Sequence, residues 1–72
     1  MLDIIARKYA TRPEYRVIEV RVQVHGFERL TPRAARAALS IAFGNDLEGE
    51  VVDSASGIGY RVYAKSARKI SL

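Results

Sequence analysis

Few side chains in this 72-residue chain have the chemistry of catalytic or metal-binding groups. There is one histidine, His25, and there is no cysteine, so cysteine nucleophiles and thiolate zinc sites are excluded. No Ser-His-Asp arrangement can be placed by spacing. His25 precedes Gly26 at the predicted end of a strand, where a solvated side chain is the expected state. We therefore predict that the protein is not an enzyme.

Acidic side chains are concentrated in residues 44–53, which contain no base. These acids are Asp46, Glu48, Glu50 and Asp53. Carboxylate oxygens suit magnesium or calcium, but the spacing does not match the calcium loop of helix-loop-helix proteins. We interpret the run as a solvated acidic edge that discourages strand-to-strand aggregation. No metal and no other cofactor is predicted.

Aromatic and basic side chains occupy alternate positions, and therefore one face, in each of two predicted strands. In the alternating stretch 15–25, this face includes Tyr15, Arg21, Gln23 and His25. In the later stretch 58–65, it includes Arg61, Tyr63 and Lys65. If the two strands are neighbours, these side chains converge on a flat, wet surface of the kind that stacks bases and contacts phosphates. The alternative is an ordinary solvent face, because tyrosine is common in strands.

A second candidate patch lies on a predicted helix, where Arg33 and Arg36 stand three residues apart on the polar face. They could contact phosphates or an acidic protein patch, or simply form a solvated helix surface. The chain has 12 Lys and Arg against 8 Asp and Glu, a net charge of +4. Most of its bases are arginines, which make forked contacts to phosphate or carboxylate.

Periodicity and turn residues predict the elements that position these groups. Thr31 and Pro32 are a typical helix N-cap and first helical residue, and Gly44 is a typical stop. Residues 1–10 alternate like a strand, with a short helix as the alternative. In order, the expected elements are strands at 1–10 and 15–25, a helix at 32–43, strands at 50–55 and 58–65, a turn at 66–69 and a possible short edge strand at 70–72.

This order predicts an α+β fold with the layout β-β-α-β-β. We expect one domain, residues 1–72, in which an antiparallel sheet of four to five strands packs one face against one helix. The alanine-rich helix can lie close to the sheet; its apolar face is predicted to contain Ala34, Ala35, Ala38, Leu39, Ile41 and Ala42. The predicted core contains Ile18, Val20, Val22, Val24, Ala35, Leu39, Ala42, Tyr60 and Val62.

No apolar run approaches the ~20 residues that span a bilayer, and the first residues do not resemble a signal peptide. Together with the absence of cysteine, this predicts a soluble, cytoplasmic protein without a membrane partner. A single core of this size provides only about 3–5 kcal/mol of net stability. Self-association into a homodimer would add to it.

The layout of residues 15–65 resembles that of very small proteins of phages and mobile elements, including some anti-CRISPR proteins. The similar features are a strand, the helix start Thr31-Pro32-Arg33-Ala34-Ala35, the acidic step Asp46-Leu47-Glu48-Gly49 and a closing hairpin. The resemblance implies a non-enzymatic inhibitor that binds a protein–RNA complex and blocks access of target DNA. No functional residue is transferred by a motif. The alternatives are direct binding of DNA or RNA by the open sheet face, and a dimerising subunit that uses an exposed edge strand.

Overall fold

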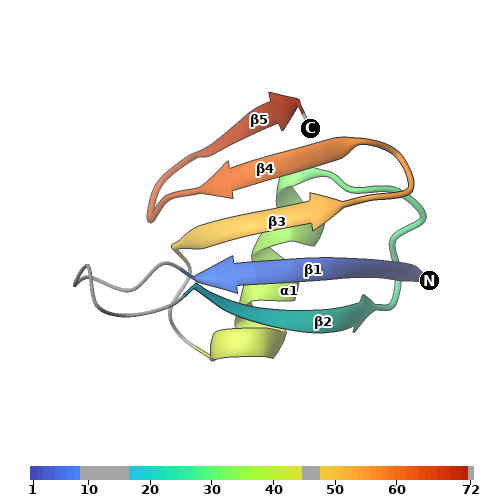
Figure 1. Ribbon diagram of the computed structural model, residues 1–72, viewed down its shortest axis with the longest axis horizontal. Helices are drawn as coiled ribbons and strands as arrows, with labels where there is room; N and C mark the ends of the chain where they lie inside the picture. The colour runs from blue at the N-terminus through green and yellow to red at the C-terminus, as the bar shows by residue number, and fades with distance from the viewer. Residues whose placement is uncertain (9–16, 45–47, 72) are drawn as a thin grey trace.

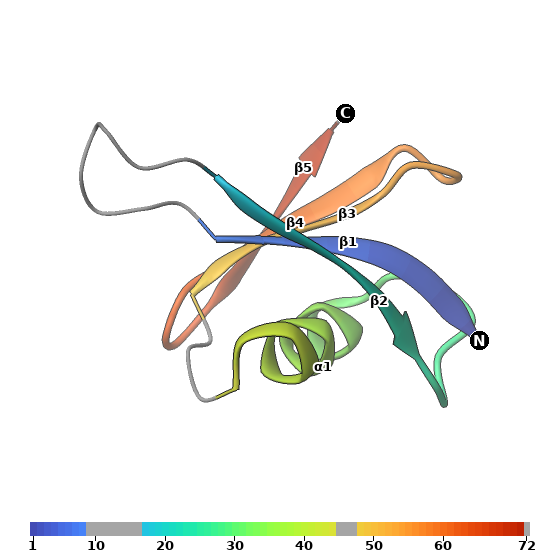
Figure 2. The same ribbon diagram turned by 60° about the horizontal axis from the view of Figure 1, so that its bottom comes forward.

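One antiparallel sheet and one helix make up the parts of the chain that this computed structural model describes, which are residues 1–8, 17–44 and 48–71 (Figure 1). The predicted α+β class and the helix packed across one sheet face are confirmed (Figure 2). The elements are β1 (Leu2–Lys8), β2 (Ile18–Val24), α1 (Pro32–Phe43), β3 (Gly49–Asp53), β4 (Ile58–Val62) and β5 (Ala67–Ser71).

The spatial order of the strands is β2-β1-β3-β4-β5, with every neighbouring pair antiparallel. The hypothesis that the second and fourth strands are neighbours is therefore wrong, because β1 and β3 lie between them. The position of β1 follows from its side chains. Ile4 and Ala6 are buried on the helix side, and Ile5 is half-buried on the other side. Apolar residues on both faces are typical of a strand inside a sheet rather than at its edge.

Helix α1 begins and ends as its sequence predicts. Thr31 has extended backbone geometry, and its side chain accepts a hydrogen bond from the Ala34 amide at 3.2 Å. Gly44 has a φ of 69° and donates its amide to the Ser40 carbonyl at 2.9 Å. Because a positive φ is costly for residues with a Cβ, glycine suits this position.

The core lies between α1 and the sheet. Ile18 of the predicted core lies outside it, and so does Ile41, which the sequence predicts on the apolar face of the helix but not in the core. Ile18 is 53% exposed and Ile41 is 61% exposed, so neither is a core residue. Ile18 begins the edge strand β2, and Ile41 lies at the margin of the apolar face of α1. Strand β1 contributes residues that were not predicted. The fully buried side chains of largest volume are Ile4, Val24, Leu39, Val51 and Val62.

The last hairpin turns earlier than expected. The predicted turn at 66–69 is wrong, because Tyr63 donates its amide to the Ser66 carbonyl at 2.8 Å and Val62 then pairs with Ala67. This early turn ends β4 at Val62 and lengthens β5. Lys65 therefore lies in a turn and not on a strand.

The helix α1 contains 12 residues. A helix needs ~20 residues to cross a bilayer, and no helix in the described ranges is both long and apolar enough to do so.

Candidate nucleic-acid interface

The sheet face opposite α1 carries a row of charged side chains that crosses all five strands. The register places them side by side in the order Glu19, Arg7, Glu50, Arg61 and Arg68. Arg7 Nε lies 2.7 Å from Glu19 Oε1, and Arg7 Nη1 lies 3.3 Å from Glu50 Oε1. Arg61 Nη2 lies 3.5 Å from Glu50 Oε2. We call this row the charge ladder.

Glu50 is the centre of the charge ladder and only 5% exposed. Its position on the inner strand β3 corrects the prediction of a solvated acidic edge. Asp53 is buried as well, at 8% exposure, and accepts hydrogen bonds from the Ala55 amide and the Ser56 hydroxyl, at 3.2 and 3.0 Å. These two acids therefore stabilise the sheet and the β3–β4 turn. Among the described residues, no group of three or more potential metal ligands is close enough together to hold an ion.

The alternation of charge in the ladder breaks at its last step. Arg61 of β4 and Arg68 of β5 stand directly opposite each other. Like charges in this position are destabilising. Arg61 is paired with Glu50, whereas Arg68 has no ion pair within the part of the chain that the structure describes. One end of the ladder thus has a surplus of positive charge.

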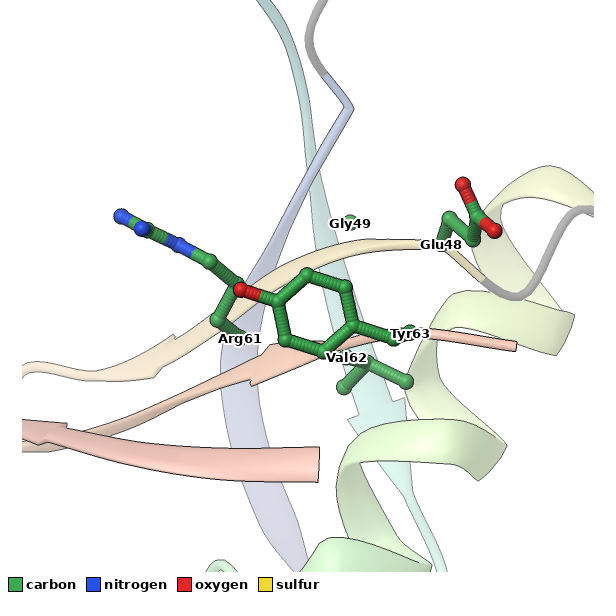
Figure 3. Close-up of a pocket in the computed structure, with 5 residues that line it drawn as sticks. All are labelled: Glu48, Gly49, Arg61, Val62 and Tyr63. Carbon is green, nitrogen blue, oxygen red and sulfur yellow. The ribbon is translucent and has the colours of Figure 1, made fainter. Parts of the chain in front are cut away.

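Tyr63 lies beside this end of the ladder. The residue is 42% exposed, and its hydroxyl lies toward the Arg61 side chain (Figure 3). A side-chain hydrogen bond with Tyr63, together with the Glu50 carboxylate, raises the pKa of Arg61 above its ordinary value. Arg61 is a cation, as arginine side chains in proteins generally are. An open cavity of about 340 Å³ adjoins both side chains and is also lined by Glu48, Gly49 and Val62.

The turn and edge strand that follow are basic. Lys65, Arg68 and Lys69 are all exposed, and residues 54–72 contain no acid. Arg68 points to the same sheet face as Arg61, whereas Lys69 pairs with Tyr60 on the helix side. We define the hairpin surface as Arg61, Tyr63, Lys65 and Arg68.

Arg21 does not belong to this surface, although it lies on the same sheet face. It is on β2, which β1 and β3 separate from the β4 strand of Arg61, and its Nε lies 3.2 Å from Asp3 Oδ1. The predicted convergence of Arg21 with the later strand is therefore not formed. Tyr15 lies outside the described residues, so its part in that hypothesis stays a prediction. His25 is exposed just beyond β2.

The two arginines of the helix patch have different environments. Arg36 is half-buried and donates from Nη1 to the backbone carbonyl of Tyr63 at 3.2 Å. Arg33 is exposed and has no ion pair within the described ranges. Arg36 thus ties α1 to the hairpin surface, and Arg33 is the freer cation.

An apolar row beside the charge ladder was missed from the sequence. Ile5, Val52, Gly59 and Ile70 stand in register on the open face, and Val52 is 4% exposed there. Ile70 covers Gly59, since a Cβ at Gly59 would lie 3.0 Å from Ile70 Cγ1. Consecutive apolar residues in β1 and β3 were the available signal for this second small cluster.

Comparison with models of known protein families, with curated proteins and with solved structures found no match.

Proposed function

We propose that the protein is a non-enzymatic binding module that contacts the phosphate backbone of single-stranded nucleic acid through the hairpin surface. The observation that carries this proposal is the pair of arginines, Arg61 and Arg68, placed directly opposite each other at the end of an otherwise alternating ladder. An anion between the two guanidinium groups would relieve their repulsion. Phosphate oxygens suit this role because they accept paired hydrogen bonds from arginine.

The neighbouring side chains support a nucleic acid over a small anion. Tyr63 offers an exposed ring beside Arg61, and bases of any sequence stack on such rings. Lys65 in the turn extends the positive charge along the hairpin. A chain of phosphates and bases could contact all of these groups at once, with little dependence on base identity.

Fluorescence anisotropy with labelled single-stranded oligonucleotides of about 12 nucleotides tests the proposal. We expect binding in low salt, with an affinity that falls as salt rises at a log–log slope of about −0.7 per phosphate contacted. Arg68→Glu should weaken binding by at least about tenfold, because it replaces the unpaired cation with an anion. Tyr63→Ala should weaken it by about 1–3 kcal/mol if a base stacks on the ring.

Arg33→Glu is the matched control, because it makes the same change of charge at an exposed site on the helix. Its affinity should stay close to that of the unchanged protein. Absence of any binding in low salt would refute the proposal. A larger loss from Arg33→Glu than from Arg68→Glu would instead identify the helix patch as the contact surface. Circular dichroism would verify that each variant is folded.

A nucleoprotein partner is the second candidate, as the anti-CRISPR resemblance implies. The exposed Tyr63 beside Arg61 favours it, because tyrosine and arginine are the residues that most often anchor protein interfaces. In this case the protein would bind a purified multisubunit protein–RNA effector complex and reduce its binding of target DNA. The Arg68→Glu variant should then lose this inhibition. Failure to bind any of a representative panel of such complexes would argue against this role.

A further inference from the structure

Strand β2 forms one edge of the sheet, and β1 is its neighbour on the inner side. Edge strands present unpaired backbone groups on which another strand can pair. Two apolar side chains at the start of this edge are exposed, Val17 at 45% and Ile18 at 53%. These features suit the addition of a further strand beside β2.

The side chains of β2 on the open face indicate which strand this would be. Glu19 is the negative end of the charge ladder and its side chain is 50% exposed. Arg21 follows on the same face, and its side chain is 80% exposed. Its ion pair with Asp3 lies at the surface, where such pairs contribute little to stability. Glu19 and Arg21 can therefore both pair with charges on an added strand.

We propose that two copies of this chain associate through β2, antiparallel, about a two-fold axis at Val20. This register places Glu19 opposite the partner's Arg21 and Arg21 opposite the partner's Glu19. It continues the alternating charges of the ladder across the interface. On the helix side it places Ile18 opposite the partner's Val22, so that the exposed Ile18 gains an apolar neighbour. The result is one continuous sheet with both helices on the same face.

Neighbouring registers lack this complementarity. A two-fold axis at Arg21 would place that arginine opposite the partner's Arg21, and an axis at Glu19 would place two glutamates opposite each other. Such like-charged pairs are destabilising. Registers shifted by one residue would put apolar side chains on the wrong face.

The other edge strand fits a second copy less well. Self-pairing of β5 about Lys69 would place lysine opposite lysine, beside the repelling Arg61 and Arg68. Pairing of β2 with a partner's β5 would form one Glu19–arginine contact, whereas the β2 pairing forms two. Such a head-to-tail contact would also form rings or open filaments rather than a closed dimer of two copies.

Analytical ultracentrifugation of the 72-residue protein over a wide concentration range tests the proposal. We expect the mass to rise from 8.0 kDa to twice that value and to stop there. In Arg21→Glu, Glu19 of each copy would face an acid at position 21 of the partner. The two like charges repel, so the dimer dissociation constant of this variant should rise at least about tenfold. Arg33→Glu, which makes the same change of charge away from β2, should leave that constant unchanged.

A mixing experiment isolates the two symmetric contacts. Arg21→Glu carries two acids on its β2 edge, and Glu19→Arg carries two bases, so each variant should be monomeric alone. In an equimolar mixture, acids face bases at both positions, and the dimer mass should return. If Glu19→Arg does not fold, Ile18→Lys is the second test. It places a charge at the β2 edge where the partner's Val22 would pack, so this variant should be monomeric.

Three outcomes would overturn the proposal. They are a monomer at every concentration, a dimer that Arg21→Glu does not weaken, and a mass that grows beyond the dimer. None of them depends on nucleic acid, so the proposed function and this interface are tested separately.

Discussion

Arg36 of α1 donates a hydrogen bond from Nη1 to the backbone carbonyl oxygen of Tyr63, at 3.2 Å. This contact joins the helix to the residue where β4 gives way to the last turn. Arg36, which is predicted from the sequence as part of a binding patch, therefore has a structural role. It helps to position the ring of Tyr63 on the hairpin surface.

Arg36→Ala should lower the free energy of unfolding by about 0.5–1.5 kcal/mol, the usual net contribution of one hydrogen bond. It should also speed hydrogen exchange at the Tyr63 amide, which donates to Ser66 across the turn. Chemical denaturation and amide exchange measure the two effects. Arg33→Ala, on the exposed side of α1, should change neither. Equal effects of the two variants would show that the contact does not hold the turn.

Glu50→Gln should destabilise the protein by about 1–3 kcal/mol, because it leaves Arg7 and Arg61 near each other without the central carboxylate. Solvent screening of these two partly exposed arginines keeps the effect below that of a fully buried ion pair. Urea denaturation followed by circular dichroism measures it. Glu28→Gln, at an exposed site, should stay within about 0.5 kcal/mol of the unchanged protein. Similar stability of both variants would contradict a structural role of Glu50.

Gly49→Ala should be strongly destabilising, by about 3 kcal/mol, the upper end of the cost of overpacking. A Cβ at Gly49 would overlap the backbone carbonyl of Arg7 and also meet Leu39 Cδ2 at 3.0 Å. Gly59→Ala is the comparison, since its Cβ would meet the movable side chain of Ile70 at 3.0 Å and would stay 3.2 Å from the nearest backbone atom, the Val51 carbonyl oxygen. In thermal unfolding, Gly59→Ala should have a higher midpoint temperature than Gly49→Ala. The opposite ranking would mean that β1 and β3 can separate at little cost.

Leu39→Ala should cost about 2–5 kcal/mol, because Leu39 is fully buried and the change leaves a cavity. A domain of this size has only about 3–5 kcal/mol in total, so this variant should be largely unfolded. Ile41→Ala should change stability by no more than about 0.5 kcal/mol, since Ile41 is exposed. Denaturation of the two variants side by side checks whether α1 has the orientation described. Equal losses would place Ile41 in the core.

Local chemistry allowed much of the fold to be predicted. The Thr31 cap and the Gly44 stop are encoded by adjacent residues, and the alternation of β2 is a period-two pattern. The strand order could not be obtained in this way. It depends on which strand pairs with β1 after the chain has passed through α1, and nothing local in the sequence determines that pairing. Ile5 gave a signal, since an apolar residue on the polar parity indicates an inner strand.

The candidate site was predicted residue by residue more successfully than as a surface. Arg61 and Tyr63 were named from parity, and both lie at the end of the charge ladder. The ion pairs were not foreseen, because they depend on register between strands that are distant in sequence. Glu50 shows the difficulty: in the sequence it is one of four acids, and only the pairing of β3 places it between two arginines.

Strands β1 and β2 form one unit that is local in sequence, and β3, β4 and β5 form another. The two meet along a short line where Ile5, Ala6 and Arg7 pair with Val52, Val51 and Glu50. Each unit can form early because its strands are joined by short connections. Pairing β1 with β3 instead closes a long loop that includes the whole helix. We therefore expect docking of the two halves to set the folding rate. Substitutions along that line should slow folding, and those in the β4–β5 turn should mainly speed unfolding.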